Sequence, residues 1–397
     1  MKTTIGALPF DYNQDDVFLF MLSQRRHLHA NPELSFQEAK TASYVAKVLL
    51  DLGLEVYERV TDHSLIGILK GSRPGKCIGV RAELDALPLD EKTALPYAST
   101  VSGAMHACGH DIHMAVVLGL AKVLSDNRNN LCGTVVLVFE SGEELLPGGA
   151  RGILESDIFK RNIPDIMLGM HVLPELEAGK VGFRAGQYMA SSDEVYITVH
   201  GKGGHAALPN TVVDPVLIAS HVVVALQQVV SRNAQPIVPT VLSFGKVTAN
   251  GANNIIPNQV LLEGTFRTMD EQWRVDAHQR IASIAKGISE SMGGTCTVDI
   301  RSGYASVYNN EALTQNATSV ATKLLGEANV ITLEPRMTAD DFAFFSQAIP
   351  SVFFRLGVGL SDGTMYGLHN PQFHANEDSM ATGIKILLAT IGENMNG

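Results

Sequence analysis

Side chains that can bind metal ions or move protons are concentrated in a few short segments of this sequence. Each segment follows an apolar run typical of a strand, or lies in a loop after one. Active sites of open α/β sheets lie outside the carboxyl ends of the strands, so residues far apart in the sequence could meet there. The segments are Arg81–Asp85 (RAELD), Met105–Asp111 (MHACGHD) and Gly142–Glu144 (GEE), with His171 and His369 as single residues.

The Cys-x-His pair of Cys108 and His110 is the first candidate for metal binding. In an extended segment, side chains two residues apart point to the same side, so both could bind a common metal site. A thiolate with an imidazole suits zinc, and also manganese, cobalt or nickel. The alternative for a single cysteine is a small buried hydrophobic residue. The neighbouring His106 and His113 are expected to be structural or to support the ligands.

The adjacent carboxylates Glu143 and Glu144 follow the apolar run TVVLVF. Adjacent side chains diverge, so one could bind metal while the other faces a metal-bound water, as metal-assisted hydrolysis requires. Asp85, at the end of another strand, could orient a ligand. The alternative for the two glutamates is a solvated acidic turn, and for His171 and His369 it is a structural role.

The elements that must position these side chains alternate between helix and strand in the first part of the chain. Continuous apolar runs predict strands at 134–139 and 165–170, and helical spacing predicts a helix that Asp111 would cap. Strands that are apolar on both faces indicate a mostly parallel sheet covered by helices. The helix–strand alternation resumes after about residue 304. The predicted fold class is therefore α/β.

The middle of the chain has a different pattern. The predicted order is β-α-β-β-α-β, with an alternating strand at 194–200 and a helix that starts at Asp214 and the proline after it. This is the order of a ferredoxin-like α+β unit with an antiparallel sheet. We therefore expect an α/β domain made of residues 1–186 and 304–397, into which residues 187–303 are inserted.

The net charge argues against two classes of partner. The chain has 30 Lys plus Arg and 41 Asp plus Glu, which gives a net charge of −11. A nucleic-acid-binding protein would normally have a basic face, and an anionic membrane would repel this balance. We therefore expect no nucleic acid and no membrane as partner.

The cysteines and the N-terminus indicate a cytoplasmic protein. Four cysteines without a C-x-x-C pair are too sparse for a disulfide scaffold, so reduced thiols are expected. Residues 1–16 contain no long apolar core, so no signal peptide is visible. The most apolar stretch, residues 215–230, is expected to be a buried helix that is too short and too polar to span a bilayer.

The sequence resembles the M20 metallopeptidase superfamily, in its branch of aminoacylases and hippurate hydrolases. The motifs run from RRHLHANPEL at residues 25–34 through RAELDALP and MHACGHDIHMA to LHNPQF, so the resemblance covers nearly the whole chain. It implies a zinc-peptidase-like catalytic domain with an inserted lid or dimerisation domain. The chain departs from the branch at FESG, where FQPA is common, at TADDF, where GSEDF is common, and at Glu83, where aspartate is usual.

The resemblance also implies a dinuclear metal site and a set of roles for the residues around it. Two divalent ions are expected, with zinc, manganese, nickel and cobalt as candidates. Glu143 would be the general base, and Asp85 would orient the site. The implied ligands are Cys108, His110, Glu144, His171 and His369.

In the inserted domain, the resemblance assigns three residues to substrate recognition. His205, in the segment GKGGH, would help to stabilise the tetrahedral intermediate, often from the partner subunit. Asn254 and Arg267 would hold the substrate carboxylate. Without the resemblance, a loop histidine and a surface ion pair are the ordinary interpretations of His205 and Arg267. The resemblance further implies a homodimer or homotetramer that forms through the lid domain.

The expected activity is that of a metal-dependent amidohydrolase. It would cleave N-acyl or N-aroyl amino acids, hippurate-like compounds first, to a carboxylic acid and a free amino acid. One alternative is a metallo-dipeptidase or carboxypeptidase that acts on unblocked peptides. The other is a non-catalytic protein that binds metal or acylated amino acids.

Overall fold

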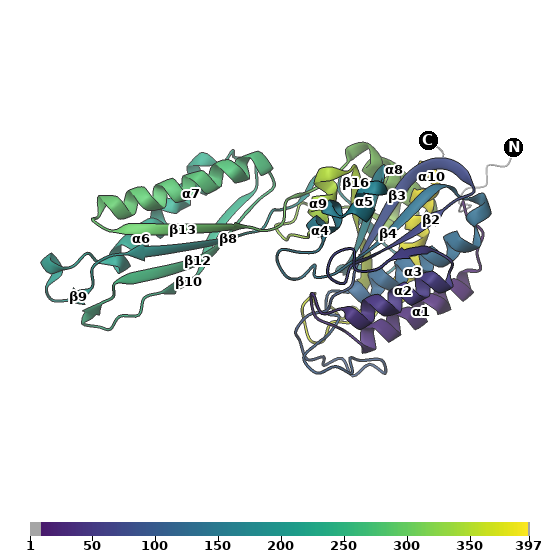
Figure 1. Ribbon diagram of the computed structural model, residues 1–397, viewed down its shortest axis with the longest axis horizontal. Helices are drawn as coiled ribbons and strands as arrows, with labels where there is room; N and C mark the ends of the chain where they lie inside the picture. The colour runs from purple at the N-terminus through teal and green to yellow at the C-terminus, as the bar shows by residue number, and fades with distance from the viewer. Residues whose placement is uncertain (1–8, 396–397) are drawn as a thin grey trace. The chain divides into compact units, whose positions relative to one another are not determined.

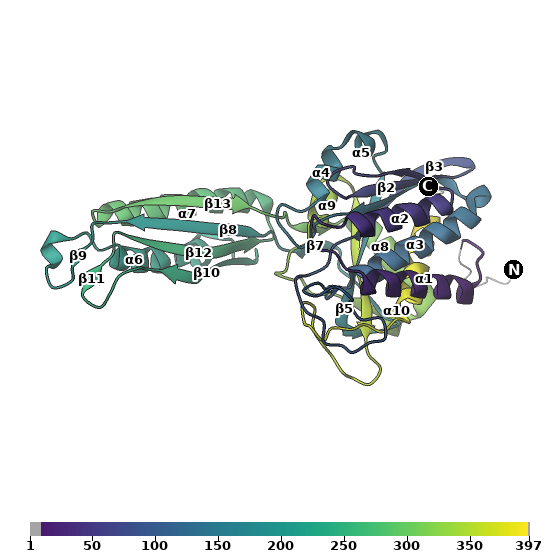
Figure 2. The same cartoon turned by 60° about the horizontal axis from the view of Figure 1, so that its bottom comes forward.

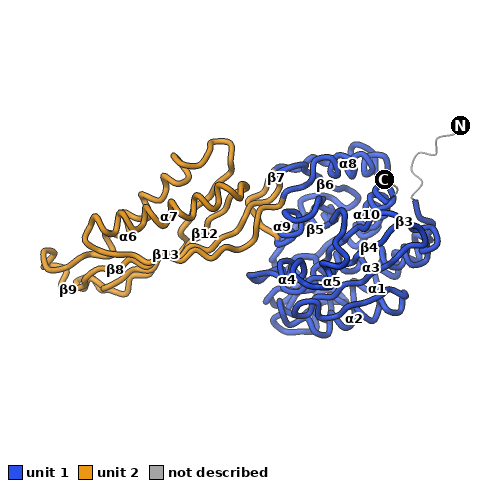
Figure 3. Tube along the Cα trace, turned by 45° about the horizontal axis from the view of Figure 1, so that its top comes forward, with its two compact units in different colours: residues 1–187, 308–334, 341–397 blue, residues 188–307, 335–340 orange. Residues whose placement is uncertain are grey.

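The computed structural model describes residues 9–395, and these form two compact units (Figure 3). Unit 1 contains the chain up to residue 187, residues 308–334 and the chain from residue 341, and unit 2 contains residues 188–307 and 335–340. The sequence predicts the boundaries of the inserted domain near residues 186 and 303. It gives no sign that residues 335–340 belong to unit 2 as well. Residues 1–8 and 396–397 lie outside the described residues, and with them the start of the segment searched for a signal peptide.

Unit 1 is built on an eight-stranded sheet (Figure 1). Parallel pairing joins β4, β3, β5 and β16 at its centre. Toward one edge β2 is antiparallel to β4 and to β1, and toward the other edge β6 is antiparallel to β16 but parallel to β15. The expected α/β class is confirmed, with a sheet that is mixed. In spatial order the strands are β1 (Glu55–Tyr57), β2 (Leu65–Lys70), β4 (Cys132–Glu140), β3 (Arg73–Glu83), β5 (Ile166–Glu177), β16 (Ser351–Gly359), β6 (Val181–Phe183) and β15 (Val330–Thr332).

Helices cover both faces of this sheet. Met170 of β5 faces α10, where it lies against Gly383, whereas the preceding Gly169 faces Phe342 of α9. Because successive strand residues point to opposite faces, α9 and α10 lie on opposite sides of the sheet. The helices of unit 1 are α1 (Gln14–Ala30), α2 (Ala39–Asp51), α3 (His110–Asp126), α4 (Ala150–Glu155), α5 (Asp157–Arg161), α8 (Glu311–Leu325), α9 (Phe342–Ala348) and α10 (Ser379–Met395).

The central helix α3 begins two residues earlier than a cap at Asp111 would allow. Its first residue is His110, and Gly109 stands before it with φ of 82°. The Asp111 carboxylate instead accepts hydrogen bonds from Arg25 Nε and His29 Nδ1, both at 2.9 Å. The predicted N-cap is therefore wrong, because buried partners on α1 hold this carboxylate inside the first turn.

Unit 2 has the β-α-β-β-α-β order and the antiparallel sheet that the sequence predicts. The strand order is β10-β12-β8-β13, and both helices pack against one another and against the sheet. Asp214 caps α6 through the amides of the first turn, as expected. The main elements are β8 (Asp193–His200), α6 (Pro215–Gln228), β10 (Thr240–Thr248), β12 (Gln259–Thr268), α7 (Glu271–Ser291) and β13 (Thr295–Ser302).

Helix α6 differs from the buried helix that the sequence predicts. It continues through a π-helical turn to Asn233, so that its length and composition suffice to cross a membrane, a property shared with many helices of soluble proteins. Only 33% of its most apolar 18-residue stretch is buried. Ile218 and Val222 pack into the core of unit 2, whereas Leu217 and Val224 are exposed. The expectation of a buried helix is therefore wrong for the outer face, and the expectation that the stretch is too short and too polar to span a bilayer is wrong for the helix as it runs from Pro215 to Asn233.

Candidate functional site

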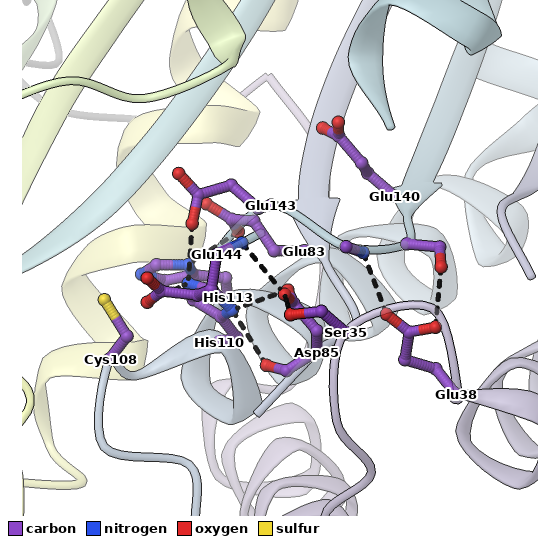
Figure 4. A network of polar contacts seen from close by, with 12 residues as sticks. Ser35, Glu38, Glu83, Asp85, Cys108, His110, His113, Glu140, Glu143 and Glu144 are labelled. Carbon is purple, nitrogen blue, oxygen red and sulfur yellow. Dashed lines mark hydrogen bonds and ion pairs between the residues drawn. The ribbon is translucent and has the colours of Figure 1, made fainter. Parts of the chain in front are cut away.

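Unit 1 gathers seven of the predicted site residues around the start of α3. Figure 4 shows Asp85, Cys108, His110, Glu143 and Glu144 among them. They come from the segment just after β3, the segment before α3 and the first residue of that helix, the loop after β4, the strand β5 and the loop between β16 and α10. Residues 141–144 of the loop after β4 are called the Glu143 loop below. The seven residues are Asp85, Cys108, His110, Glu143, Glu144, His171 and His369.

The five candidate ligands form two overlapping groups. In each group the candidate ligand atoms lie within 4.8 Å of one another. Cys108 belongs to both groups, and its sulfur lies 3.4 Å from His171 Nε2. In the second group, His369 Nε2 lies 3.1 Å from Glu144 Oε1. The groups are Cys108, His110 and His171, and Cys108, Glu144 and His369.

The donor atoms of this cluster fit divalent metal ions. His110 is held by its Nδ1, which lies 2.9 Å from the Asp85 carbonyl and 3.2 Å from Asp85 Oδ1. Its buried Nε2 has no hydrogen-bond partner among the described residues. A carboxylate that fixes one ring nitrogen of a ligating histidine is a frequent arrangement in metal sites. The set of sulfur, nitrogen and oxygen donors suits zinc and related ions.

The electrostatics of the cluster favour added positive charge. Burial opposes protonation of His110, but Glu83 and Asp85 outweigh it and raise its pKa to about 10. Burial raises the pKa of the Cys108 thiol well above its usual range, and the negative charges of Glu144 and Glu143 raise it as well. Burial lowers the pKa of His171 well below its usual range, and the positive charge of Arg355 lowers it as well, so this imidazole is neutral. A cation would compensate the carboxylates and stabilise the thiolate form of Cys108.

Asp85 connects three parts of the site. Besides its contacts with His110, its Oδ2 accepts hydrogen bonds from Ser35 Oγ at 2.7 Å and from the Glu144 amide at 3.0 Å. Burial raises the pKa of the Asp85 carboxyl. The hydrogen bond to His110 and the charge of that ring lower this pKa by more than burial raises it, so the net shift is downward. Asp85 is thus an ionised side chain that joins His110 to the Glu143 loop.

The buried carboxylate of Glu83 supports the ring of His113. Glu83 Oε2 lies 2.7 Å from His113 Nδ1, and His113 Nε2 accepts a hydrogen bond from the Val172 amide at 3.0 Å. Both ring nitrogens of His113 are therefore engaged in holding the segment beside His171. His106 is also buried, and neither of its ring nitrogens has a hydrogen-bond partner among the described residues.

Two further carboxylates surround the guanidinium of Arg81, which also binds Glu83. Glu140 Oε2 lies 2.7 Å from Arg81 Nε, and Asp341 Oδ1 lies 2.7 Å from Arg81 Nη2. All four side chains are buried. Glu83 and Glu140 are positions where the sequence departs from the branch that it resembles, and both belong to this cluster around Arg81.

Two local predictions about the site are wrong. Cys108 and His110 do not lie in one extended segment, because Gly109 turns the chain and His110 is already helical. His171 does not end its strand, because β5 continues to Glu177. The strand extends so far because it pairs with β16 beyond the point where β3 ends its pairing with it, at Gly169.

The three remaining predicted residues lie in unit 2. His205 is on β9 (Gly204–His205), which pairs with β11 (Ile255–Ile256), as Figure 2 shows. The Asn254 carbonyl accepts a hydrogen bond from the Ala206 amide, so Asn254 is close to His205. Arg267 lies on β12, where its Nη1 donates to the Met337 carbonyl at 3.2 Å. This contact, to a backbone oxygen, is not the surface ion pair that was the alternative.

Sequence reasoning did not identify Ser35 and Glu38, which also contact this site. Both precede α2, and both are drawn in Figure 4. Ser35 binds Asp85, and Glu38 binds the backbone and a side chain of the Glu143 loop. Nothing in the spacing of these residues marks them, because their partners lie 50 and about 100 positions further along the chain.

Comparison with known proteins gives consistent matches along the chain. The family model described as Peptidase family M20/M25/M40 matches residues 79–393. The chain is 39% identical over 364 residues to the N-acetyldiaminopimelate deacetylase of Bacillus cytotoxicus, covering 91% of this chain and 95% of that protein. It is 36% identical over 360 residues to the N-acetyl-L-cysteine deacetylase of Bacillus subtilis, covering 91% and 84%.

A solved structure has the same fold over almost the full length. It is that of the Bacillus subtilis YXEP protein, described as a dinuclear metal binding peptidase from the M20 family. The TM-score is 0.84 and the sequence identity is 30%, with 96% of this chain and 99% of that chain covered.

Proposed function

This chain belongs to peptidase family M20/M25/M40, and on that basis we propose that it is a metal-dependent amidohydrolase of N-acyl amino acids. The observation that carries the proposal is the pair of overlapping ligand groups that share Cys108. The names of two relatives, which describe deacetylases of N-acetylated amino acids, support the substrate class. Within this class we propose N-acyl and N-aroyl amino acids of the hippurate type as substrates. The products are a carboxylic acid and a free amino acid.

We assign two divalent metal ions to the cluster, with zinc, manganese, nickel or cobalt as the candidates. When bound, such ions lower the pKa of water and polarise the amide carbonyl. Asp85 is the residue that orients His110 toward them and holds the Glu143 loop. The ligands are Cys108, His110, Glu144, His171 and His369.

Glu143 is the proposed general base. Its side chain is 8% exposed, and its Oε2 lies 3.8 Å from His110 Nε2, inside the cluster. From this place its carboxylate can take a proton from the attacking water and then return it to the departing amide nitrogen. Glu144, the next residue, points its carboxylate at His369. The two adjacent carboxylates therefore divide proton transfer and metal binding.

We assign recognition of the substrate to unit 2. His205 would donate a hydrogen bond to the developing oxyanion, from the same or a partner subunit, which is worth on the order of 3 kcal/mol in other enzymes. Arg267 offers a planar guanidinium to the substrate carboxylate, with Asn254 as a second donor. We further propose a homodimer or homotetramer that forms through unit 2, and a cytoplasmic location, which the four free cysteines support.

The proposal is tested by hydrolysis of a small panel of compounds. The panel contains N-benzoylglycine, N-acetylmethionine, N-acetylcysteine, N-acetyldiaminopimelate and unblocked dipeptides. The protein is first stripped with a chelator and then supplied with Zn²⁺, Mn²⁺, Co²⁺ or Ni²⁺. Metal-restored cleavage of acylated amino acids alone is the expected result.

The same panel separates the two alternatives. Cleavage of dipeptides alone would assign the chain to the peptidases of its family. Metal uptake without turnover of any compound, together with thermal shifts caused by acylated amino acids, would indicate a binding protein.

A further inference from the structure

A turn in front of α2 contacts the Glu143 loop through a single buried carboxylate. Glu38 Oε2 accepts a hydrogen bond from Ser141 Oγ at 2.6 Å, and its Oε1 accepts one from the Gly142 amide at 2.8 Å (Figure 4). The same Oε1 accepts a bond from the Phe36 amide at 2.9 Å. Glu38 is fully buried. One side chain therefore joins its own turn to the two residues that precede Glu143.

The backbone on both sides of this contact has an unusual conformation. Phe36 has φ of 62° and Gly142 has φ of 77°. A Cβ atom at Gly142 would lie 2.4 Å from Phe36 Cε1, so the two segments are in close contact. A left-handed conformation costs an aromatic residue energy and persists only where surrounding contacts enforce it. The Glu38 carboxylate binds the amides of both residues, so it is one of these contacts.

A second link from the same turn reaches the other end of the Glu143 loop. Ser35 Oγ donates to Asp85 Oδ2, which also accepts the Glu144 amide. Glu38 holds the loop before Glu143, and Ser35 holds it after Glu143 by way of Asp85. The position of Glu143 is therefore fixed from both sides by the turn at residues 35–38.

We propose that Glu38 is a positioning residue for Glu143. Its carboxylate holds Ser141 and Gly142 so that the Glu143 side chain stays at the metal cluster, and the inference rests on the proposed role of Glu143 as general base. Glu38 acts through the Glu143 loop and not by contact with the substrate.

Burial makes the ionised form of the Glu38 carboxylate costly. Burial raises its pKa to about 7, although hydrogen bonds from Ser141 and from backbone amides favour the ionised form. An ionised carboxylate away from water is costly, and a neutral amide could fill the same space. The charged group therefore costs stability at neutral pH, whereas its hydrogen bonds order the loop that carries the base.

Glu33 provides a matched control in the same segment. Its Oε2 accepts hydrogen bonds from the Lys40 amide at 2.8 Å, the Thr41 amide at 2.8 Å and Thr41 Oγ1 at 3.0 Å. It thus accepts as many hydrogen bonds as Glu38, but its donors all lie at the start of α2. Loss of its carboxylate should weaken the helix start and leave the Glu143 loop in place.

The test compares Glu38→Ala, Glu38→Gln and Glu33→Ala in the metal-loaded enzyme. For each we measure kcat, KM, metal content and hydrogen exchange of peptides that cover residues 139–146. Glu38→Ala should lower kcat about a hundredfold with KM and metal content nearly unchanged, because a small displacement of the base is enough for such a loss. Its loop peptides should exchange faster than in the wild type.

The conservative variant should recover most of the activity. The amide oxygen of Glu38→Gln can accept both backbone N–H groups, and its nitrogen can donate to Ser141 Oγ. Its kcat should be within about fivefold of the wild type. Glu33→Ala should retain kcat and loop protection. If Glu38→Ala does not fold, Glu38→Asp replaces it, since the shorter side chain cannot reach both segments.

Several results would overturn the assignment. Equal losses of kcat in Glu38→Ala and Glu33→Ala, with unchanged loop exchange, would make Glu38 a purely structural residue. Loss of metal from Glu38→Ala would place its effect on the ligands and not on the base. If the wild type hydrolyses no compound of the panel, the proposed function fails, but loop exchange in Glu38→Ala against Glu33→Ala still decides whether Glu38 holds the loop.

Discussion

At the scale of single residues, the carboxylates around α3 are distinguished by their partners. Asp85 and Glu83 each hold a histidine ring, whereas Glu144 lies against His369 and Glu143 lies beside His110. The adjacent Glu143 and Glu144 are chemically identical in the sequence. Only their contacts separate a proposed base from a proposed ligand.

Substitution at this pair should separate the two roles. Glu143→Gln keeps the shape of the side chain but removes the basic carboxylate, so kcat should fall by about a hundredfold or more while metal content is retained. Glu144→Gln should instead lower metal content. Metal analysis and steady-state kinetics on both variants check this, and retained turnover in Glu143→Gln would contradict the role of Glu143.

The charge state of Glu38 gives a prediction about pH and stability. Burial raises the pKa of Glu38 to about 7 from its ordinary 4.5. Between these two pH values Glu38 is protonated in the metal-free folded protein and ionised in the unfolded chain. The stability that protonated Glu38 contributes is fully present below the pKa of the unfolded chain. It is lost as the pH rises through the higher pKa of the folded protein.

Glu38→Gln removes this titration. From about pH 5 to about pH 8, the free energy of unfolding of the variant should rise relative to the wild type by on the order of 2 kcal/mol. Urea unfolding of both metal-free proteins across this range measures the difference. A difference that is independent of pH would show that Glu38 does not titrate in this range.

At the scale of elements, the start of α3 places two candidate ligands on either side of one glycine. Gly109 has φ of 82°, and a Cβ there would lie 2.5 Å from Val172 Cγ2. This close approach brings the α3 start to β5, which carries His171. The geometry of three ligands therefore depends on the absence of a side chain at one position.

Gly109→Ala should disturb both stability and metal binding. The backbone strain and the contact with Val172 together should cost about 1–3 kcal/mol and displace Cys108 and His110. Gly103→Ala is the control, because Gly103 has φ of 74° but nothing within 4 Å of a Cβ. Gly103→Ala should lower the free energy of unfolding through backbone strain, with metal affinity unchanged. Thermal unfolding and metal titration test both, and equal metal affinities would contradict the argument.

At the scale of the whole molecule, the candidate chemistry is divided between two units. Unit 1 contains the seven residues of the cluster, and unit 2 contains His205, Asn254 and Arg267. Each unit has its own hydrophobic core. Metal binding should therefore stabilise unit 1 directly, because all its candidate ligands belong to that unit.

Addition of Zn²⁺ or Mn²⁺ to the metal-free protein should raise its thermal midpoint, since a ligand that binds only the folded state stabilises it. Hydrogen exchange should slow around Cys108, His110 and the Glu143 loop, while the sheet of unit 2 keeps its exchange rates. Slower exchange confined to unit 2 would place the metal elsewhere. Absence of any thermal shift would contradict the metal site itself.

Local sequence patterns were enough to predict several of the elements and the α/β class. The alternating run at 194–200 and the apolar run at 134–139 lie in β8 and β4, and Asp214 caps α6 as its place before a proline predicts. Hydrophobic periodicity and capping act over a few neighbouring residues, so they can be interpreted without tertiary contacts. The motifs likewise identified the residues that the structure brings together at α3.

The pairing of side chains that are distant in the sequence follows from the packing of the folded chain. Asp111 was predicted to cap α3, but it binds Arg25, which lies 86 positions earlier. Glu38 binds Ser141 across 103 positions, and no local pattern marks it. Such contacts depend on which surfaces pack together after folding, and a buried polar group takes whichever partner the packing brings to it. The candidate ligands and Asp85 were therefore predictable from the sequence, whereas Ser35 and Glu38, which bind Asp85 and the Glu143 loop, were not.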